Sequence, residues 1–300
     1  MRALNIKPDA VIVDATYGRG GHSEEILKRL GGSGRLLVLD RDPQAVADAR
    51  RRVGADHRVI VERSKFSQLS EVCARHGLIG RVTAVLFDLG VSSPQLDEAN
   101  RGFSFRQAGP LDMRMDPSAG ISAAEWLNQA GEAELMRVIS AYGEERYARR
   151  IARAIVRART ESPITDTRVL AEIVARAVPM RERRKNPATR TFQAIRLHVN
   201  RELDELDAVL PQTLHTLAPG GRLAVISFHS LEDRRVKQFI RSESHGPAVP
   251  RGMPAPPTAF QPRLRIIGRA VRASAHEAQR NPRARSAILR VAERTEIDRA

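Results

Sequence analysis

The chain has 300 residues, which is enough to bury a full hydrophobic core in one large domain or two smaller ones. Its 50 lysines and arginines against 35 acidic residues give a formal net charge of +15, a field that attracts RNA, DNA or an anionic membrane. The single cysteine, Cys73, excludes a disulfide framework and a thiolate zinc site, and no apolar run approaches the roughly 20 residues of a membrane span. We therefore expect a soluble, cytoplasmic protein with no membrane partner. Most of the positive charge is arginine, which codon bias also produces, so charge alone does not establish a nucleic-acid partner.

Short runs rich in Val, Ile and Leu alternate with segments of helical spacing along the first part of the chain. Such runs are typical of parallel strands that are buried on both faces. Asp42 and Pro43 begin one of the intervening helices, since Asp caps a helix and Pro fits its first turn. The pattern predicts an α/β fold with a doubly wound, mostly parallel sheet. The predicted strands are Val11–Asp14, Arg35–Asp40, Arg58–Val61, Ala84–Asp88 and Arg222–Phe228.

A long interval between the fourth and fifth predicted strands is helical by pattern and far exceeds what a crossover needs. We therefore predict an inserted all-helical domain at residues 106–196, within a discontinuous core made of residues 1–105 and 197–300. The core should resume with a leucine-rich helix around Leu203–Leu214. The predicted helices of the insertion are Ile121–Gln129, Glu132–Tyr142, Glu144–Arg159 and Thr167–Val178.

The C-terminal part of the sequence predicts a long loop followed by two strands. Prolines interrupt any regular element from Ser242 to Arg263. The segments Leu264–Val271 and Ser286–Val291 then have the composition of strands.

A glycine-rich loop follows the first predicted strand in the segment VIVDATYGRGGHSEEIL. Gly18, Gly20 and Gly21 let the backbone approach a ligand where a side chain would collide. Asp40 ends the second strand about 20 residues later, where an acid accepts the hydroxyls of a bound ribose. The two features together indicate an adenosine cofactor, although the glycines alone would also suit a tight turn without a ligand.

The details of this loop favour S-adenosylmethionine over NAD. The loop reads G-x-G-G-H, and Ser23 stands where a dinucleotide loop has its third glycine. Asp14, Glu24 and Glu25 surround the loop with negative charge, which disfavours a diphosphate. The zwitterionic methionine end of S-adenosylmethionine tolerates these acids better.

A second acid, Asp88, ends the fourth predicted strand in the segment VLFDLGVSSPQLD. Ligands of open α/β sheets bind at the carboxyl ends of the strands, so we expect Asp88 to face the crevice beside the glycine loop. A carboxylate there would accept the N–H groups of a nucleobase amine and hold it in line with a sulfonium methyl group. This chemistry requires no metal. The alternative role of Asp88 is to cap a turn or a helix.

The chain contains, over almost its whole length, the segments DATYGRGGHS, VLDRDPQA, LFDLGVSSPQLD, RGFSF with LDMRMD, TRTFQAIRLHVNREL, GGRLAVISFHSLEDRRVK and NPRARSAILRVAE. Together they resemble the bacterial 16S rRNA cytosine-N4 methyltransferase family. The resemblance implies a Rossmann-like class I methyltransferase core. It also implies methyl transfer from S-adenosylmethionine to the N4 amine of one cytidine in the decoding region of 16S rRNA, within the small ribosomal subunit.

The resemblance further implies which residues contact the cofactor, with Asp88 also as the catalytic residue. By pattern alone, His22 is a helix-start residue and Phe66 a core residue, although a ring just after the third strand could cover an adenine. Family members usually carry a histidine, VLL and an acid ahead of the part that matches LNIKP, and the resemblance implies that such a segment forms part of the cofactor or substrate wall. The implied contacts are Gly20, Gly21, His22, Asp40, Phe66, Asp88 and Gln95.

Arginines and planar polar side chains in the insertion are the candidate RNA contacts. One helix aligns Arg146, Arg150, Arg153 and Arg157, which could follow phosphates; the alternative is a solvated face paired to Glu144, Glu145 and Glu161. A second basic cluster comprises Arg181, Arg183, Arg184 and Lys185. Aromatic residues make up only 4% of the chain, so recognition should rest on RNA shape and phosphates, with one base extruded. The predicted substrate contacts are Ser93, Arg190, Gln193, Arg196, Asn200 and His229.

Two other functions remain open at the level of the sequence. A DNA amino-methyltransferase would share the chemistry, but its usual S/D/N-P-P-aromatic tetrad is replaced here by Ser93-Pro94-Gln95-Leu96. A non-catalytic ribosome-assembly factor would keep the basic surface without needing Asp40 or Asp88. The sequence also leaves open whether the protein forms a homodimer.

Overall fold

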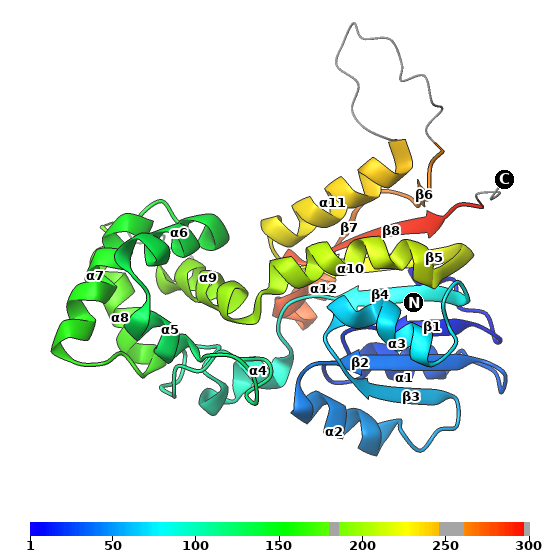
Figure 1. The fold of residues 1–300 in the computed structure, drawn as a ribbon, viewed down its shortest axis with the longest axis horizontal. Helices are drawn as coiled ribbons and strands as arrows, with labels where there is room; N and C mark the ends of the chain where they lie inside the picture. Colours follow the sequence, from blue (N-terminus) through cyan, green and yellow to red (C-terminus); the bar gives the residue numbers. More distant parts are fainter. Residues whose placement is uncertain (180–185, 246–260, 297–300) are drawn as a thin grey trace, which may run out of the picture. The chain divides into compact units, whose positions relative to one another are not determined.

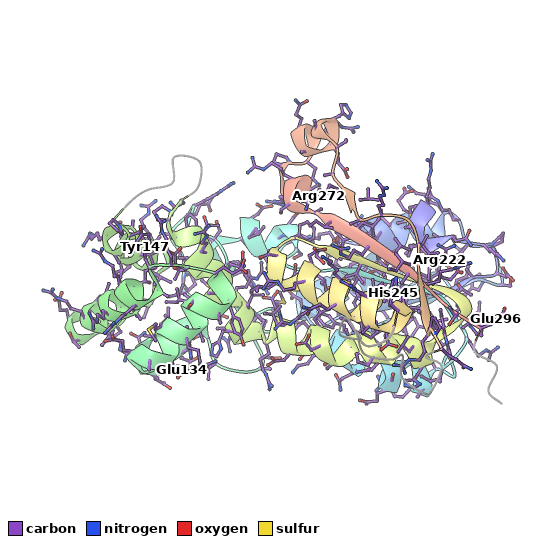
Figure 2. All side chains as sticks on the ribbon, turned by 90° about the horizontal axis from the view of Figure 1, so that it is seen from above. Glu134, Tyr147, Arg222, His245, Arg272 and Glu296 are labelled. Atoms are coloured by element: carbon purple, nitrogen blue, oxygen red, sulfur yellow. The ribbon has the colours of Figure 1, made fainter. Side chains whose placement is uncertain are left out.

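The computed structural model describes residues 1–179, 186–245 and 261–296 of the chain. The chain forms two compact units, Met1–Gly90 with Leu203–Ala300, and Val91–Glu202. We call the first the sheet unit and the second the helical unit. Figure 1 shows the ribbon of both, and Figure 2 adds the side chains, with Arg222 labelled in the sheet unit and Tyr147 in the helical unit. None of the described helices combines the length and hydropathy that a bilayer span requires.

The sheet unit contains an 8-stranded sheet in the order β3-β2-β1-β4-β5-β8-β6, with β7 paired to β8 outside this path. The strands β1 to β5 are parallel to one another, and β8 runs antiparallel to β5, β6 and β7. The predicted doubly wound, mostly parallel sheet is therefore confirmed. The strands are β1 Val11–Asp14, β2 Arg35–Asp40, β3 Val59–Arg63, β4 Val82–Asp88, β5 Leu217–Ser227, β6 Leu264–Ile266, β7 Val271–Arg272 and β8 Ile288–Arg294.

Two hydrophobic clusters cover the two faces of this sheet, which explains why its strands read as unbroken apolar runs. In β2, Leu37 belongs to one cluster, whereas its neighbours Leu36 and Val38 belong to the other. The first cluster includes residues of α3, α10 and α11, and the second includes residues of α1 and α2 (Figure 1). The helices of this unit are α1 Gly21–Leu27, α2 Pro43–Arg52, α3 Leu69–Arg75, α10 Glu202–Thr216, α11 Ser230–His245 and α12 Ala275–Arg280.

The strand order reverses between β1 and β4, because the chain adds β2 and β3 on one side of β1 and then returns to add β4 on the other. The carboxyl ends of β1, β2 and β4 therefore lie at one edge of the sheet, and each ends in an acid: Asp14, Asp40 and Asp88. This reversal is the place where open α/β sheets bind their ligands.

The helical unit is held by its own hydrophobic core, which includes Trp126, Leu135 and Ile151. A capping box starts α5, because the Ser122 amide donates to Glu125 and the Glu125 amide donates to Ser122 Oγ. The helices are α4 Ser93–Asp97, α5 Ala123–Gln129, α6 Glu132–Gly143, α7 Ala148–Glu161, α8 Thr167–Ala177 and α9 Ala188–Asn200.

The boundaries between the two units differ from the predicted domain limits, which fell after residues 105 and 196. The compact units divide after Gly90 and after Glu202. Residues between 91 and 105 belong to the helical unit because Phe103 is part of its buried core and Val91 and Phe105 pack against that core. A substrate-recognition role for the helical unit stays a prediction.

Several predicted element limits were wrong. A helix from Glu144 is interrupted because Glu144 adopts φ +48°, and α7 begins only at Ala148. A single strand Leu264–Val271 is split into β6 and β7, between which Gly268 adopts φ +67°. The predicted loop from Ser242 begins later, since α11 continues to His245, and residues 246–260 lie outside the described part of the chain.

Candidate functional site

Asp40 ties the glycine loop to the end of β2. Its Oδ2 accepts a hydrogen bond of 2.9 Å from the Gly18 amide, and its Oδ1 accepts one of 2.9 Å from the Asp42 amide. Each carboxylate oxygen has two lone pairs, so both oxygens keep capacity for a hydroxyl of a ribose. Burial raises the pKa of the Asp40 carboxyl to about 6, and the amide hydrogen bonds partly oppose this shift.

Gly20 and Gly21 have different surroundings. Gly20 adopts φ +76°, and a Cβ built on it would lie 2.5 Å from Tyr17 Oη. The Tyr17 hydroxyl is itself held by a 3.2 Å hydrogen bond to Asp48. By contrast, a Cβ on Gly21 would meet nothing within 4 Å. Gly20 is therefore needed for the shape of the loop, whereas the open side of Gly21 leaves room for a ligand.

Asp14 belongs to the site as well, although its charge alone did not predict a position there. It is fully buried at the end of β1, where it accepts a 2.6 Å hydrogen bond from Ser23 Oγ and a 3.3 Å bond from the Thr16 amide. Burial raises the pKa of the Asp14 carboxyl to about 6, against the lowering effect of Ser23. Its place as the last residue of a buried strand, beside two other strands that end in acids, was the signal for it.

Asp88 lies beside His22, which contacts only one of its two carboxylate oxygens. His22 Nε2 is 3.3 Å from Asp88 Oδ2, and this contact is the main cause that raises the pKa of His22. The Asp88 amide donates a 2.7 Å hydrogen bond to Thr16 Oγ1, which fixes the end of β4 against the segment that follows β1. Within the described residues, Asp88 Oδ1 is buried and has no hydrogen-bond partner. A buried acceptor without a partner is costly, so a ligand that donates an N–H or O–H would stabilise it.

The structure thus brings Gly20, Gly21, His22, Asp40 and Asp88 together at one edge of the sheet unit. This grouping fits S-adenosylmethionine, because it offers an acid for the ribose, an open glycine and a further buried acceptor.

Phe66 follows β3 directly and packs inward. Its ring lies 5.8 Å from the Phe87 ring in an edge-on arrangement and contacts the sheet-unit core. This contact orients the ring, and the predicted stacking on an adenine stays a prediction.

Gln95, the remaining predicted cofactor contact, lies in the helical unit. Its side chain is buried and its Oε1 accepts a 3.0 Å hydrogen bond from the Ser92 amide, as part of the capping box that begins α4. Ser93, predicted to touch the substrate, is exposed in the first turn of the same helix. The cofactor role of Gln95 stays a prediction.

The planar side chains of α9 bond within the helical unit. Asn200 is buried, accepting a 2.7 Å hydrogen bond from the Met115 amide and donating one of 2.7 Å to the Met113 carbonyl. Arg196 pairs with Glu202 at 2.8 Å, and Gln193 donates to the Tyr142 carbonyl at 3.2 Å. The prediction that Asn200 lies on a face open to RNA was therefore wrong. Helical spacing shows only that residues share a face, and packing against residues 113–115 decides that this part of the face is buried.

The other predicted substrate contacts, Arg190 and His229, lie in different units of the chain. Arg190 is 3.8 Å from Glu145 in the helical unit. His229 follows β5 in the sheet unit, and its Nε2 is 3.2 Å from Glu232 Oε1, beside the start of α11. Arg190 thus has an ion-pair partner, whereas His229 Nε2 is buried without a hydrogen-bond partner among the described residues, and contact with a substrate stays a prediction for each.

The arginine stripe is exposed but shorter than predicted. Arg146 precedes α7 and lies 4.6 Å from the Tyr147 ring, and Arg153 pairs with Glu132 at 3.2 Å. Arg150 and Arg157 are exposed on α7 and have no ion pair within the described residues. The cluster Arg181, Arg183, Arg184 and Lys185 lies outside the described part of the chain.

The raised pKa of Asp40 predicts a pH dependence of stability. The carboxyl has a pKa near 3.8 when unfolded and about 6 when folded, so ionising it is more costly in the folded state. The stability that the neutral Asp40 carboxyl contributes is fully present below about pH 4 and is lost as the pH rises through about 6, which lowers the free energy of unfolding by about 3 kcal/mol. Urea unfolding between these pH values should show this decline in the wild type and a smaller one in Asp40→Asn. Identical pH slopes for the two proteins would contradict the assignment.

The doubly wound sheet and the acids at its reversal point define an S-adenosylmethionine-dependent methyltransferase of the Rossmann-like class. The chain belongs to the MraW methylase family, whose model matches residues 1–295. It is 58% identical over 295 residues to Ribosomal RNA small subunit methyltransferase H of Thioalkalivibrio sulfidiphilus (strain HL-EbGR7), covering 98% of this chain and 94% of the relative.

Solved structures of low sequence identity are also similar. One is an rRNA methylase from Streptococcus thermophilus, with a TM-score of 0.42, 11% identity and coverage of 97% of this chain and 90% of the other. Another is the N-methyltransferase NodS from Bradyrhizobium japonicum WM9, with a TM-score of 0.42, 9% identity and coverage of 98% and 90%.

Proposed function

We propose that this protein methylates the N4 amine of one cytidine in the decoding region of 16S rRNA, in the small ribosomal subunit. The observation that carries the chemistry is the buried Asp88 Oδ1, an acceptor without a partner among the described residues at the end of β4. The substrate is supported by the family and by the 58% identity to a relative named as a small-subunit rRNA methyltransferase. A cytoplasmic location and a possible homodimer stay predictions, the former supported by the rRNA substrate.

Asp88 has the chemistry that an exocyclic amine requires. The lone pair of such an amine is delocalised into the base, so the amine is a weak nucleophile. A hydrogen bond from the amine N–H to Asp88 Oδ1 raises the electron density on the amine nitrogen and orients the amine for attack. When bound, S-adenosylmethionine would supply a methyl group carried on a sulfonium, and the C–S bonding electron pair would stay on the sulfur, which becomes a thioether. The surplus proton on the methylated amine can pass to Asp88 Oδ1 or to water.

His22 and Asp40 have supporting roles in this proposal. His22 holds the second Asp88 oxygen at 3.3 Å, which directs Oδ1 toward the amine. Asp40 holds the ribose hydroxyls while its amide bonds from Gly18 and Asp42 keep the carboxylate in place. Gly21 leaves the space that the cofactor needs.

The test is mass spectrometry of nucleosides from small subunits incubated with the protein and isotope-labelled S-adenosylmethionine. The proposal expects the label in N4-methylcytidine at one position of 16S rRNA. Label in duplex DNA but not in rRNA would favour a DNA amino-methyltransferase. RNA binding without any label, and without heat on titration with S-adenosylmethionine, would favour a non-catalytic assembly factor.

The exposed arginines of α7 support an RNA-binding role for the helical unit. The variant Arg150→Glu with Arg157→Glu should weaken binding to 16S rRNA and reduce the salt slope of log affinity by about 2, since each lost phosphate contact contributes about 0.9. Filter binding at several salt concentrations measures both quantities. Arg176→Glu with Arg168→Glu on α8 makes the same charge change and serves as the comparison. An unchanged slope in the α7 variant would show that these arginines do not contact phosphate.

A further inference from the structure

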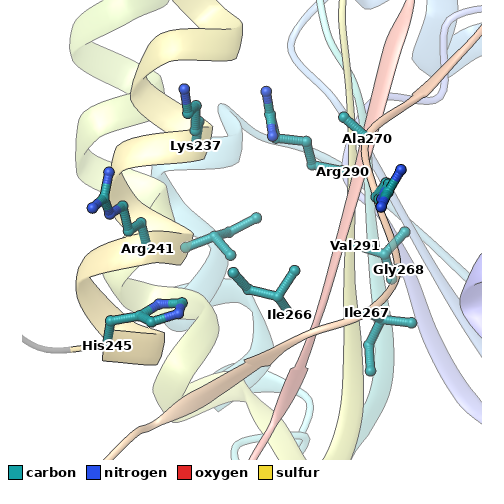
Figure 3. A pocket seen from close by; sticks show the side chains of 11 residues that line it. Lys237, Arg241, His245, Ile266, Ile267, Gly268, Ala270, Arg290 and Val291 are labelled. Carbon is teal, nitrogen blue, oxygen red and sulfur yellow. The ribbon is translucent and has the colours of Figure 1, made fainter.

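A groove of about 440 Å³ lies in the sheet unit between α11 on one side and β6, residues 267–270 and β8 on the other (Figure 3). We call it the basic groove. Its volume is in the range of ligand sites in proteins, about 300–1,000 Å³. Figure 3 shows Lys237, Arg241 and His245 along α11, across from Ile266 and Arg290. The groove is lined by Lys237, Ile240, Arg241, His245, Ile266, Ile267, Gly268, Arg269, Ala270, Arg290 and Val291.

The charge of the basic groove is not neutralised by the acids near it. Asp233 is occupied by Arg290, with two hydrogen bonds of 2.7 and 2.9 Å. Glu243 pairs with Arg263 at 2.6 Å. In the described part of the chain, Lys237, Arg241 and Arg269 are exposed and form no ion pair. The rim therefore presents several free cations to a single region of solvent, which favours an anionic ligand.

The floor of the groove is apolar, which narrows the chemistry of that ligand. Ile240 is buried, Val291 is half-buried, and Ile266 is 44% exposed. A ligand that is only a phosphate would leave the apolar floor exposed to water. An apolar protein segment would leave the cations of the rim without partners. A nucleotide of a single-stranded nucleic acid satisfies both, because its base has an apolar face and its flanking phosphates are anionic.

The position of α11 connects the basic groove to the methylation site. This helix begins at Ser230, directly after β5, whose end is paired with the end of β4 at Asp88. Lys237 is seven residues further along, so the groove begins about 10 Å along the helix at a rise of 1.5 Å per residue. An RNA strand that inserts one base at the strand ends can therefore continue along α11 within the same unit.

We propose that the basic groove binds a single-stranded segment of the rRNA substrate, with a base on the isoleucine floor and phosphates on the cationic rim. The inference rests on the proposed rRNA substrate and adds to it a contact site outside the catalytic residues. The lining has no Phe, Tyr or Trp side chain. The groove therefore contributes affinity and register with little base selectivity, because base edges are not read.

The test compares two double variants of the full chain that change the net charge equally. Lys237→Glu with Arg241→Glu reverses the rim. Lys7→Glu with Arg81→Glu is the control, since both side chains are exposed just before β1 and β4, at the opposite ends of those strands from the acids. The rim variant should bind small-subunit rRNA at least tenfold more weakly near 0.1 M salt, with the salt slope reduced by about 1.4, since each phosphate contact of a single strand contributes about 0.7. Its KM for rRNA should rise, while kcat at saturating rRNA and the affinity for S-adenosylmethionine remain as in the wild type.

A third variant, Ile266→Gln, tests the floor without changing charge. It should weaken rRNA binding several-fold and leave the salt slope unchanged, because no phosphate contact is lost. Circular dichroism and thermal unfolding establish that each variant is folded. Equal losses in the rim variant and the control would show an effect of net charge alone and would overturn the proposal, as would wild-type affinity and slope in the rim variant.

Two further readouts separate the remaining cases. Saturable binding of cytidine monophosphate that Ile266→Gln abolishes, with unchanged rRNA affinity, would assign the groove to a small nucleotide and overturn the rRNA contact. The proposed function fails separately if wild-type protein places no label on small-subunit cytidine, whatever the binding of the rim variant. Loss of rRNA binding by the rim variant in that case would still support the groove as an RNA site.

Discussion

Asp88→Asn should reduce the rate of methyl transfer by about 10²- to 10⁴-fold, the usual contribution of a group that accepts a proton in the transition state. The amide keeps the shape of the carboxylate but loses its charge, so Oδ1 becomes a weaker acceptor for the amine of the base. The Asp88 backbone bond to Thr16 does not depend on the side chain, and the strand end should persist. Single-turnover transfer of labelled methyl to small subunits, at saturating cofactor, measures the effect.

Binding measurements show whether Asp88→Asn loses catalysis or loses binding of rRNA or cofactor. Association of Asp88→Asn with rRNA should stay within about twofold of the wild type. Calorimetry with S-adenosylmethionine separates a loss of cofactor binding from a loss of chemistry, because Asp88 is predicted to serve both. Asp9→Asn removes an exposed acid just before β1 and should retain wild-type transfer. Full turnover by Asp88→Asn would refute the catalytic role.

Alanine at Gly20 and at Gly21 should have opposite consequences. Gly20→Ala forces a side chain into φ +76° and places its methyl 2.5 Å from Tyr17 Oη, so the free energy of unfolding should fall by at least about 2 kcal/mol. Gly21 is in the first turn of α1 and its Cβ would meet nothing within 4 Å. Gly21→Ala should therefore keep or slightly raise stability, since Ala favours a helix by about 0.5–1 kcal/mol.

The decisive measurement for this pair is cofactor affinity. Gly21→Ala should bind S-adenosylmethionine at least about tenfold more weakly despite its stability, because the new methyl occupies the open space beside the glycine loop. Urea unfolding and calorimetry on the two variants give both quantities. Wild-type affinity in Gly21→Ala would mean that the cofactor does not approach this glycine. Unchanged stability in Gly20→Ala would contradict the loop geometry.

The class of fold and the acids Asp40 and Asp88 follow from the sequence, because buried parallel strands have a pattern that is local. Apolar runs end in an acid, and a parallel arrangement places all such ends at one edge of the sheet. The cofactor class could be narrowed for the same reason, from the glycine spacing and the charges of Asp14, Glu24 and Glu25. The specific substrate came only from resemblance to a family, since no local pattern identifies one cytidine.

Hydrogen-bond partners and burial could not be read from spacing, because they depend on residues far apart in the chain. Asn200 shares a helical face with Gln193 and Arg196, but residues 113–115 cover it. Asp14 was noted for its charge, whereas the structure buries it against Ser23 and raises its pKa. The basic groove likewise combines Lys237 with Ile266 and Arg290, which the pairing of β8 with β5 and β6 brings near α11.

The sequence by itself thus determined the sheet, the glycine loop and the acids at the strand ends, since each depends on neighbouring residues and a repeating pattern. The tertiary structure decided which of the three strand-end acids has an oxygen without a partner among the described residues, which of Gly20 and Gly21 faces open space and which polar side chains are buried. These properties are set by packing between distant segments, and free energies of burial and hydrogen bonding are defined only when those segments meet.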